Sequence, residues 1–285
     1  MPRSQPAEPL DVSPVLRAER DAFVALLEDL SPEDWSRPTE CPAWTVQGIA
    51  LHVLGDDLSL LARQRDAALP AVFRNDVGAW AGDYRSLDDF NEHWVETAQF
   101  FSPRLIVEAL RVTGDWTLRW YTAVDPTSVG EAVAFVSDDP APYWMIAARE
   151  YLERWIHQLQ VRRAVDRPGL DEPGFVVPAV ATLTRGFPRA FRALPFADGT
   201  AVELVIDDPE GASWTVRRDG GDWTLHDGAV GVPTIRLTLD AGSAALLFSR
   251  ALTPAAARGR VAAEGEPEVA EAVVAGLAAF FGQNR

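Results

Sequence analysis

Residues 45–61 read TVQGIALHVLGDDLSLL, and this stretch carries the clearest periodic signal in the chain. Thr45 is a residue type that caps helix N-termini, because its hydroxyl can accept a hydrogen bond from a backbone N–H of the first turn. The apolar residues after it recur at the i, i+3, i+4, i+7 spacing of one helix face. We therefore predict a long amphipathic helix, whose apolar stripe consists of Val46, Ile49, Ala50, Val53, Leu54, Leu58 and Leu61.

Three further stretches of the N-terminal half show helical spacing. We expect helices at residues 14–30, at residues 86–126 with an interruption at Pro103, and at residues 142–165. Together with residues 45–61 they predict a four-helix bundle, preceded by a loose, Pro-rich arm at residues 1–12. Five tryptophans are expected in the bundle core, namely Trp44, Trp116, Trp120, Trp144 and Trp155.

The composition changes after Arg167, where a Pro- and Gly-rich linker spans residues 166–174. A helical stretch at residues 176–193 follows, and then short alternating runs typical of strands. The sequence thus predicts an α+β protein with a helical bundle at residues 1–167 and a smaller α+β domain at residues 175–285. The expected strands are residues 201–206, 213–217, 223–226 and 234–239, and helices are expected at residues 241–250 and 266–282.

The bulk composition limits the classes of function. The 285 residues carry a formal net charge of −16, and such an acidic surface repels nucleic-acid phosphates and anionic membranes. The single cysteine, Cys41, excludes a disulfide within the chain. No apolar run reaches the roughly 18 residues of a membrane span, and the N-terminus lacks the apolar core of a secretory signal. We expect a cytoplasmic monomer or homodimer that binds neither nucleic acid nor membrane.

Two histidines lie in the two strongest helices. Glu153 and His157 are four residues apart, so both side chains project from one ridge of their helix. His52 lies at the edge of the apolar stripe of its helix, and its small neighbours Gly48 and Gly55 leave space above the imidazole. Two imidazoles and one carboxylate on facing helices suit a zinc-like ion with one open coordination position. The three residues indicate a metal site inside the bundle.

Each of these residues also has a simpler interpretation. Glu153 could form a surface ion pair with Arg149, four residues earlier, and His157 could be a half-buried helix residue. Asp56 is a rival carboxylate, because it lies four residues after His52 on the same ridge. Taken one at a time, the simpler interpretations are favoured, and the residue pattern alone leaves the metal site undecided.

Other reactive side chains are assigned structural places. His93 is expected on a helix surface, His226 beside a turn that follows a strand, and Cys41 as a small buried residue in a loop. The chain has no Gly-rich phosphate loop and no Gly-x-Ser-x-Gly motif. Nucleotide hydrolysis and serine-hydrolase chemistry are therefore disfavoured.

Two segments of the predicted bundle resemble a known family. Residues 40–52 contain a Cys-Pro-x-Trp loop that leads to His52, and residues 153–164 read ERWIHQLQVRRA. Both are similar to segments of the mycothiol-dependent maleylpyruvate isomerase family, which belongs to the DinB/YfiT-like superfamily of metal-binding four-helix bundles. The C-terminal half, with LLFSR at residues 246–250 and EGEP at residues 264–267, resembles that family's second domain, a sterol-carrier-like α+β fold.

The resemblance implies roles for particular residues. His52, Glu153 and His157 match the family's three metal ligands, and zinc is the usual ion. Mycothiol or a related low-molecular-weight thiol is the implied cofactor. Arg250 matches an arginine of the family that could hold a substrate carboxylate, and it is the one catalytic residue that the resemblance implies here.

Two positions depart from the family's pattern. Leu159-Gln160 stands where the family often has an aromatic residue followed by Asp, and Ser249 precedes Arg250 where the family usually has Gly. The first departure removes a carboxylate that would orient a metal ligand from behind. The fold and the ligands therefore transfer from the family more readily than the substrate does.

We expect a metal-dependent enzyme that uses a thiol of the mycothiol type, either an isomerase or a thiol S-transferase, acting on a small electrophile. The alternative is a non-catalytic protein that binds or carries a small molecule, with a vestigial or structural metal site. The ten Trp residues and the sterol-carrier-like half favour that alternative. Thiol-dependent turnover of an electrophile distinguishes the two hypotheses.

Overall fold

The computed structural model describes residues 7–68, 73–74, 79–80, 87–192, 194, 196–249, 251, 256 and 259–282. The chain divides into two compact units. One consists of Leu16–Ser128 and His157–Gly169, and the other of Met1–Val15, Val129–Ile156 and Leu170–Arg285. A helical domain is followed by a domain with a sheet, which confirms the predicted α+β class. The predicted limits of the domains, residues 1–167 and 175–285, stay a prediction.

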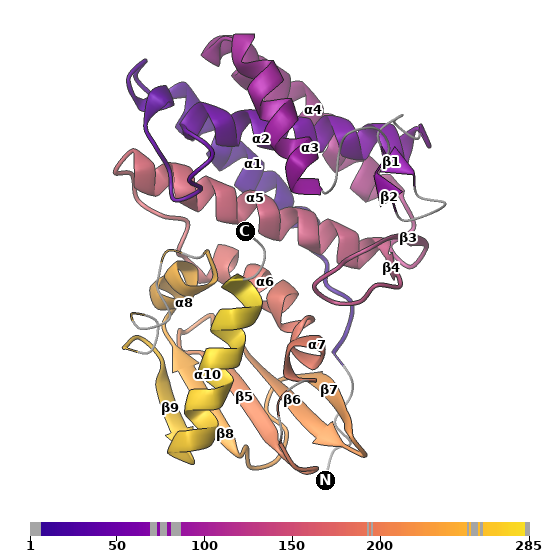
Figure 1. Ribbon diagram of the computed structural model, residues 1–285, viewed down its shortest axis with the longest axis vertical. Coiled ribbons are helices and arrows are strands. Elements are labelled where there is room, and N and C mark those ends of the chain that lie inside the picture. The colour runs from indigo at the N-terminus through magenta and orange to yellow at the C-terminus, as the bar shows by residue number, and fades with distance from the viewer. Residues whose placement is uncertain are drawn as a thin grey trace. The chain divides into compact units, whose positions relative to one another are not determined.

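The helical part of the chain runs from indigo through magenta to the pink helix α5 in Figure 1. Its helices are α1 (Ser13–Glu28), α2 (Val46–Leu60), α3 (Leu87–Thr97), α4 (Pro103–Ala123) and α5 (Tyr143–Ala164). Shorter elements are the 3-10 turns η1 (Asp34–Ser36) and η3 (Ala98–Phe100), the π-helical turn η2 (Leu61–Arg65), and the strands β1 (Phe73–Arg74) and β2 (Ala79–Trp80). Among the described residues, no helix is long and apolar enough to cross a membrane.

Capping residues determine where two of these helices begin. The Thr45 hydroxyl accepts a hydrogen bond from the backbone N–H of Gly48 at 3.3 Å, which confirms the predicted cap of α2. Ser102 caps α4 in the same way, and Pro103 occupies the first turn, where its missing N–H has no partner to lose. The interruption predicted at Pro103 is therefore the start of a separate helix.

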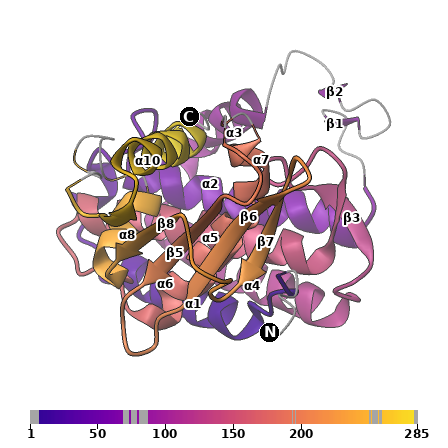
Figure 2. The ribbon, with the colours of Figure 1, turned by 90° about the horizontal axis from the view of Figure 1, so that it is seen from below.

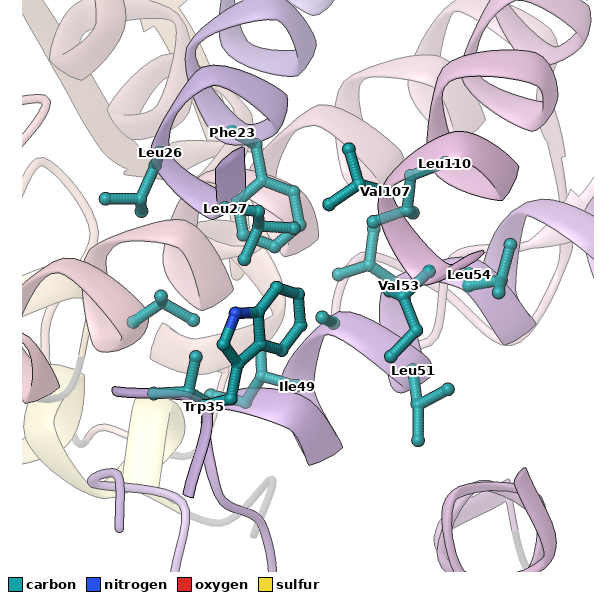
Figure 3. Packing of buried hydrophobic residues seen from close by; sticks show 14 of the residues in the cluster. Phe23, Leu26, Leu27, Trp35, Ile49, Leu51, Val53, Leu54, Val107 and Leu110 are labelled. Atoms are coloured by element: carbon teal, nitrogen blue, oxygen red, sulfur yellow. The ribbon is translucent and has the colours of Figure 1, made fainter. Parts of the chain in front are cut away.

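The core of the helical unit lies among α1, α2 and α4, with Trp35 of η1 packed into it (Figure 3). Burial of an aliphatic or aromatic side chain contributes about 1.5–3 kcal/mol, so this cluster is a main source of the unit's stability. Side chains at most 2% exposed come from all three helices, among them Phe23, Leu27, Ile49, Leu54, Ile106 and Leu110.

The predicted burial of five tryptophans is only partly confirmed. Trp155 is fully buried, and its indole N–H donates to the Leu170 carbonyl at 3.1 Å. Trp116 is 43% exposed, so its assignment to the core is wrong. In this part of α4 the buried side chains include Thr113 and Thr117, and Trp116 lies on another face of the helix. Trp44, Trp120 and Trp144 are half-buried.

A buried ion pair connects three helices of this unit. Arg20 of α1 donates to one carboxylate oxygen of Asp57 of α2 at 2.8 Å, and the Thr113 hydroxyl of α4 donates to the other at 2.7 Å. Arg20 is 5% exposed and Asp57 is fully buried. Because removal of either charge would leave the other buried and uncompensated, the pair fixes how α1, α2 and α4 align.

The second unit contains a five-stranded sheet with the strand order β7–β6–β5–β8–β9. Figure 2 shows β8, β5, β6 and β7 side by side. Neighbouring strands are antiparallel except β5 and β8, which are parallel. Its elements are β3 (Val129–Ala132), β4 (Pro140–Pro142), α6 (Pro173–Thr184), α7 (Phe187–Phe191), β5 (Ala201–Ile206), β6 (Ser213–Asp219), β7 (Asp222–Asp227), β8 (Ile235–Leu239), α8 (Ala241–Phe248), β9 (Ala262–Gly265) and α10 (Pro267–Gly282). The four predicted strands are confirmed, whereas β9 and the β3–β4 pair were not predicted.

The N-terminal arm is held at the edge of this sheet. The backbone N–H of Ala7 donates to the carbonyl of Leu225 at 3.0 Å, and that of Glu8 donates to the Asp227 carboxylate at 2.9 Å. Arg185, which is 8% exposed, donates to the Glu8 carbonyl at 2.8 Å. The expectation of a loose arm is therefore wrong from residue 7 onward, because the edge strand β7 offers backbone partners.

Candidate metal centre

The three predicted ligands lie together in the structure. His52 is on α2, and Glu153 and His157 are one turn apart on α5. One potential ligand atom from each residue lies within 4.8 Å of those of the other two. The imidazole centroids of His52 and His157 are 4.7 Å apart, with an angle of 73° between the rings. Within the described ranges, no other set of three His, Cys, Asp or Glu side chains has this spacing.

The chemistry of this donor set fits a divalent metal ion. Two imidazole nitrogens and one carboxylate oxygen are ligands that zinc accepts, and three protein ligands leave a further position for another molecule. His52 is 3% exposed and His157 is 8% exposed, so little water reaches the two imidazoles. Glu153 is partly exposed. The arrangement can hold an ion from two helices at once.

Gln160 contacts the far nitrogen of His157. Its side-chain Oε1 lies 2.9 Å from His157 Nδ1, and both side chains are buried. An amide oxygen only accepts hydrogen bonds, so Nδ1–H is the donor of this contact, and in the neutral imidazole Nε2 is then the nitrogen that has the lone pair. Gln160, one of the two residues that depart from the family pattern, therefore still provides a hydrogen-bond acceptor behind this imidazole.

The indole of Trp44 covers one face of His52. The two rings are stacked, with centroids 4.6 Å apart and an angle of 25°, and the His157 ring lies 5.9 Å from the indole. This packing needs Gly48, because a Cβ there would lie 2.9 Å from the Cβ of Trp44. Gly48 leaves space beside the imidazole, as expected, and the indole of Trp44 fills it.

Gly55 allows a second close approach on α2. A Cβ at this position would lie 2.4 Å from Nε1 of Trp94, a residue of α3. That indole N–H donates to the carbonyl of Leu51, the residue before His52, at 2.7 Å. The bond holds α3 against α2 beside the cluster.

The loop that carries Trp44 is attached to α5. The Thr39 hydroxyl donates to the Trp44 carbonyl at 2.7 Å and accepts from the backbone N–H of Cys41 at 3.2 Å. Glu40 accepts two hydrogen bonds from the guanidinium of Arg163, at 2.8 and 2.5 Å. The two segments that carry the family resemblance therefore contact each other, and the loop is held where its indole reaches His52.

The remaining candidates lie outside the cluster. Asp56, the rival carboxylate, is half-buried and does not belong to it. His93 is exposed on α3 as expected, His226 is buried in β7, and Cys41 is half-buried against the apolar core. Arg250, the predicted catalytic residue, lies outside the residues that the structure describes.

The fold and the cluster define a class of protein: helical bundles that carry imidazole and carboxylate groups on facing helices. Residues 16–162, just over half of the chain, match the family model described as "Mycothiol maleylpyruvate isomerase N-terminal domain". The chain belongs to this family.

Two solved structures share the fold. One is described as the mycothiol-dependent maleylpyruvate isomerase, with a TM-score of 0.55 and 11% identity over 89% of this chain and 92% of that chain. The other is a histidine-to-alanine variant of that enzyme, with a TM-score of 0.54 and the same identity and coverage. At this identity the likeness shows the fold. No curated protein sequence matches the chain.

Proposed function

We propose that the protein is a metal-dependent enzyme that uses a mycothiol-type thiol, either to isomerise a small electrophile or to transfer the thiol to it. The observation that supports this most directly is the buried pair of imidazoles beside the Glu153 carboxylate. It occurs in a chain that belongs to the mycothiol maleylpyruvate isomerase family. Zinc is an ion that accepts this donor set, and we propose it as the metal.

The proposal assigns a task to each residue of the centre. His52 and His157 would hold the ion from two helices, backed by Trp44 and Gln160 respectively. Glu153 would supply the anionic ligand. When bound, the ion would supply Lewis acidity, which favours the thiolate form of the cofactor over the thiol. The thiolate is the nucleophile needed for reversible addition to an activated double bond or for S-transfer. Arg250 remains the proposed partner for a substrate carboxylate.

Metal analysis of the purified protein tests the first part of this proposal. We expect about one zinc per chain in the wild type, as for a site with three protein ligands, and loss of zinc in His157→Ala. His93→Ala is the matched control, because it removes an exposed histidine of α3 outside the cluster. Equal zinc content in wild type and His157→Ala would contradict the proposal.

A thiol-consumption assay tests the second part. The zinc-loaded protein is mixed with mycothiol and a panel of small unsaturated electrophiles, with and without a chelator. We expect turnover that needs both thiol and metal and that is lost in His52→Ala. Binding of the electrophiles without turnover would instead support the alternative of a small-molecule carrier.

A further inference from the structure

We propose that Gln160 is a positioning residue that decides which nitrogen of His157 is available to a metal ion, and so how tightly the centre holds that ion. The inference rests on the proposed function, because it concerns the same centre. It goes beyond that function in giving a role to a residue that is not one of the three proposed ligands.

The contact between the two side chains is local and protected. His157 and Gln160 are three residues apart on α5, a spacing that puts both on one face of the helix. Gln160 is 7% exposed and His157 is 8% exposed. Because water has little access, no solvent molecule easily replaces the amide oxygen that lies 2.9 Å from Nδ1.

The amide oxygen selects one tautomer of the imidazole. In the neutral imidazole, a hydrogen bond donated by Nδ1–H leaves the lone pair on Nε2, the nitrogen on the other side of the ring from Gln160. Without this acceptor, either nitrogen can carry the proton and the ring can turn about its bond to Cβ. Partners behind metal-bound histidines typically change metal affinity about 10–100-fold, since they fix both the tautomer and the ring orientation.

Gln160 also differs from a carboxylate in its charge. Glu153 is the only acidic member of the cluster among the described residues, and Gln160 adds an acceptor without adding a second negative charge. A divalent ion held there would therefore keep a net positive charge. Such an ion would attract an anionic sulfur or a substrate carboxylate more strongly than an ion in a centre that has a carboxylate behind the imidazole.

Zinc titration against a competing chelator tests this role in the full-length protein. We expect Gln160→Leu to lower zinc affinity about 10–100-fold, and Gln160→Glu, which keeps an acceptor, to bind zinc at least as tightly as the wild type. Gln99→Leu is the control, because Gln99 is a side-chain amide of η3 that donates to the Val95 carbonyl and does not belong to the cluster. Its zinc affinity should not change.

The tautomer of His157 gives a second readout that needs no metal. In ¹⁵N spectra of metal-free protein, we expect a protonated Nδ1 in the wild type and in Gln160→Glu, and loss of that preference in Gln160→Leu. If Gln160→Leu fails to fold, the wild-type tautomer and the affinity of Gln160→Glu decide the question. A wild type protonated at Nε2, or weaker zinc binding by Gln160→Glu, would then overturn the inference.

The two proposals can fail separately. A wild-type protein that binds no zinc refutes the proposed function. If the wild type binds zinc and a folded Gln160→Leu variant binds it with equal affinity, only the role of Gln160 is refuted.

Discussion

Gly48 lies where α2 passes under the loop that carries Trp44, and it illustrates how one small residue can shape the centre. A methyl group there would meet the Cβ of Trp44 at 2.9 Å, which is closer than carbon atoms normally approach. The tryptophan would have to move, and with it the ring that stacks on His52. The missing side chain of Gly48 is therefore part of the site's construction.

Substitution of Gly48 by alanine should destabilise the protein by about 1–3 kcal/mol, the usual cost of overpacking. It should also weaken zinc binding, since the support behind His52 is displaced. Gly174→Ala is the matched control: Gly174 is also in the first turn of a helix, and a Cβ there has nothing within 4 Å. That change should be neutral or stabilising. Urea unfolding compares them, and a Gly48→Ala variant as stable as the wild type would contradict this account.

At the level of helices, the bundle is aligned by its apolar stripes and by the Arg20–Asp57 pair. Apolar contacts fix which faces meet, but they tolerate small slides of one helix along another. The ion pair and the Thr113 hydroxyl join α1, α2 and α4 at one point, and a slide of one helix would break these hydrogen bonds. Since α2 carries His52, this alignment also determines where that imidazole lies.

The Asp57→Leu variant should lose about 3–5 kcal/mol of unfolding free energy, because Arg20 would remain buried without its counter-charge. The double variant Arg20→Leu/Asp57→Leu should recover most of that loss, because no buried charge is left. Arg104→Leu, which breaks an exposed pair with Glu108 on α4, should change the free energy by less than about 1 kcal/mol. Chemical denaturation provides the values. A double variant no more stable than the single one would show that burial of the charge is not the cause.

For the whole molecule, local periodicity predicted most of the helices and four of the strands, because most of these elements bury a regular face. The helical stretch predicted at residues 176–193 is divided into α6 and α7. Local periodicity missed β9, whose four residues are all exposed and give no alternating pattern. It also misplaced Trp116, because helical spacing alone does not show which face of a helix turns inward when more than one face carries apolar residues.

The sequence predicted the three candidate ligands of the centre, but it did not predict the residues that surround them. Spacing joined Glu153 to His157, and the position of His52 at the edge of its helix's apolar stripe made it the third candidate. The resemblance of the flanking segments then supported the same three residues. The stacking of Trp44 on His52 and the Glu40–Arg163 contact join residues far apart in sequence, so no local pattern signals them. Gln160 did carry a signal, since it lies three residues after His157, but its neutral amide was interpreted as a lost carboxylate.

The central claim is that α2 and α5 together hold one metal ion, and an anomalous-scattering map of zinc-soaked crystals tests it most directly. We predict one strong peak among His52, Glu153 and His157, with nitrogen and oxygen atoms at about 2.0–2.2 Å. A map without a peak at that position, or with His52 turned away from α5, would contradict the claim.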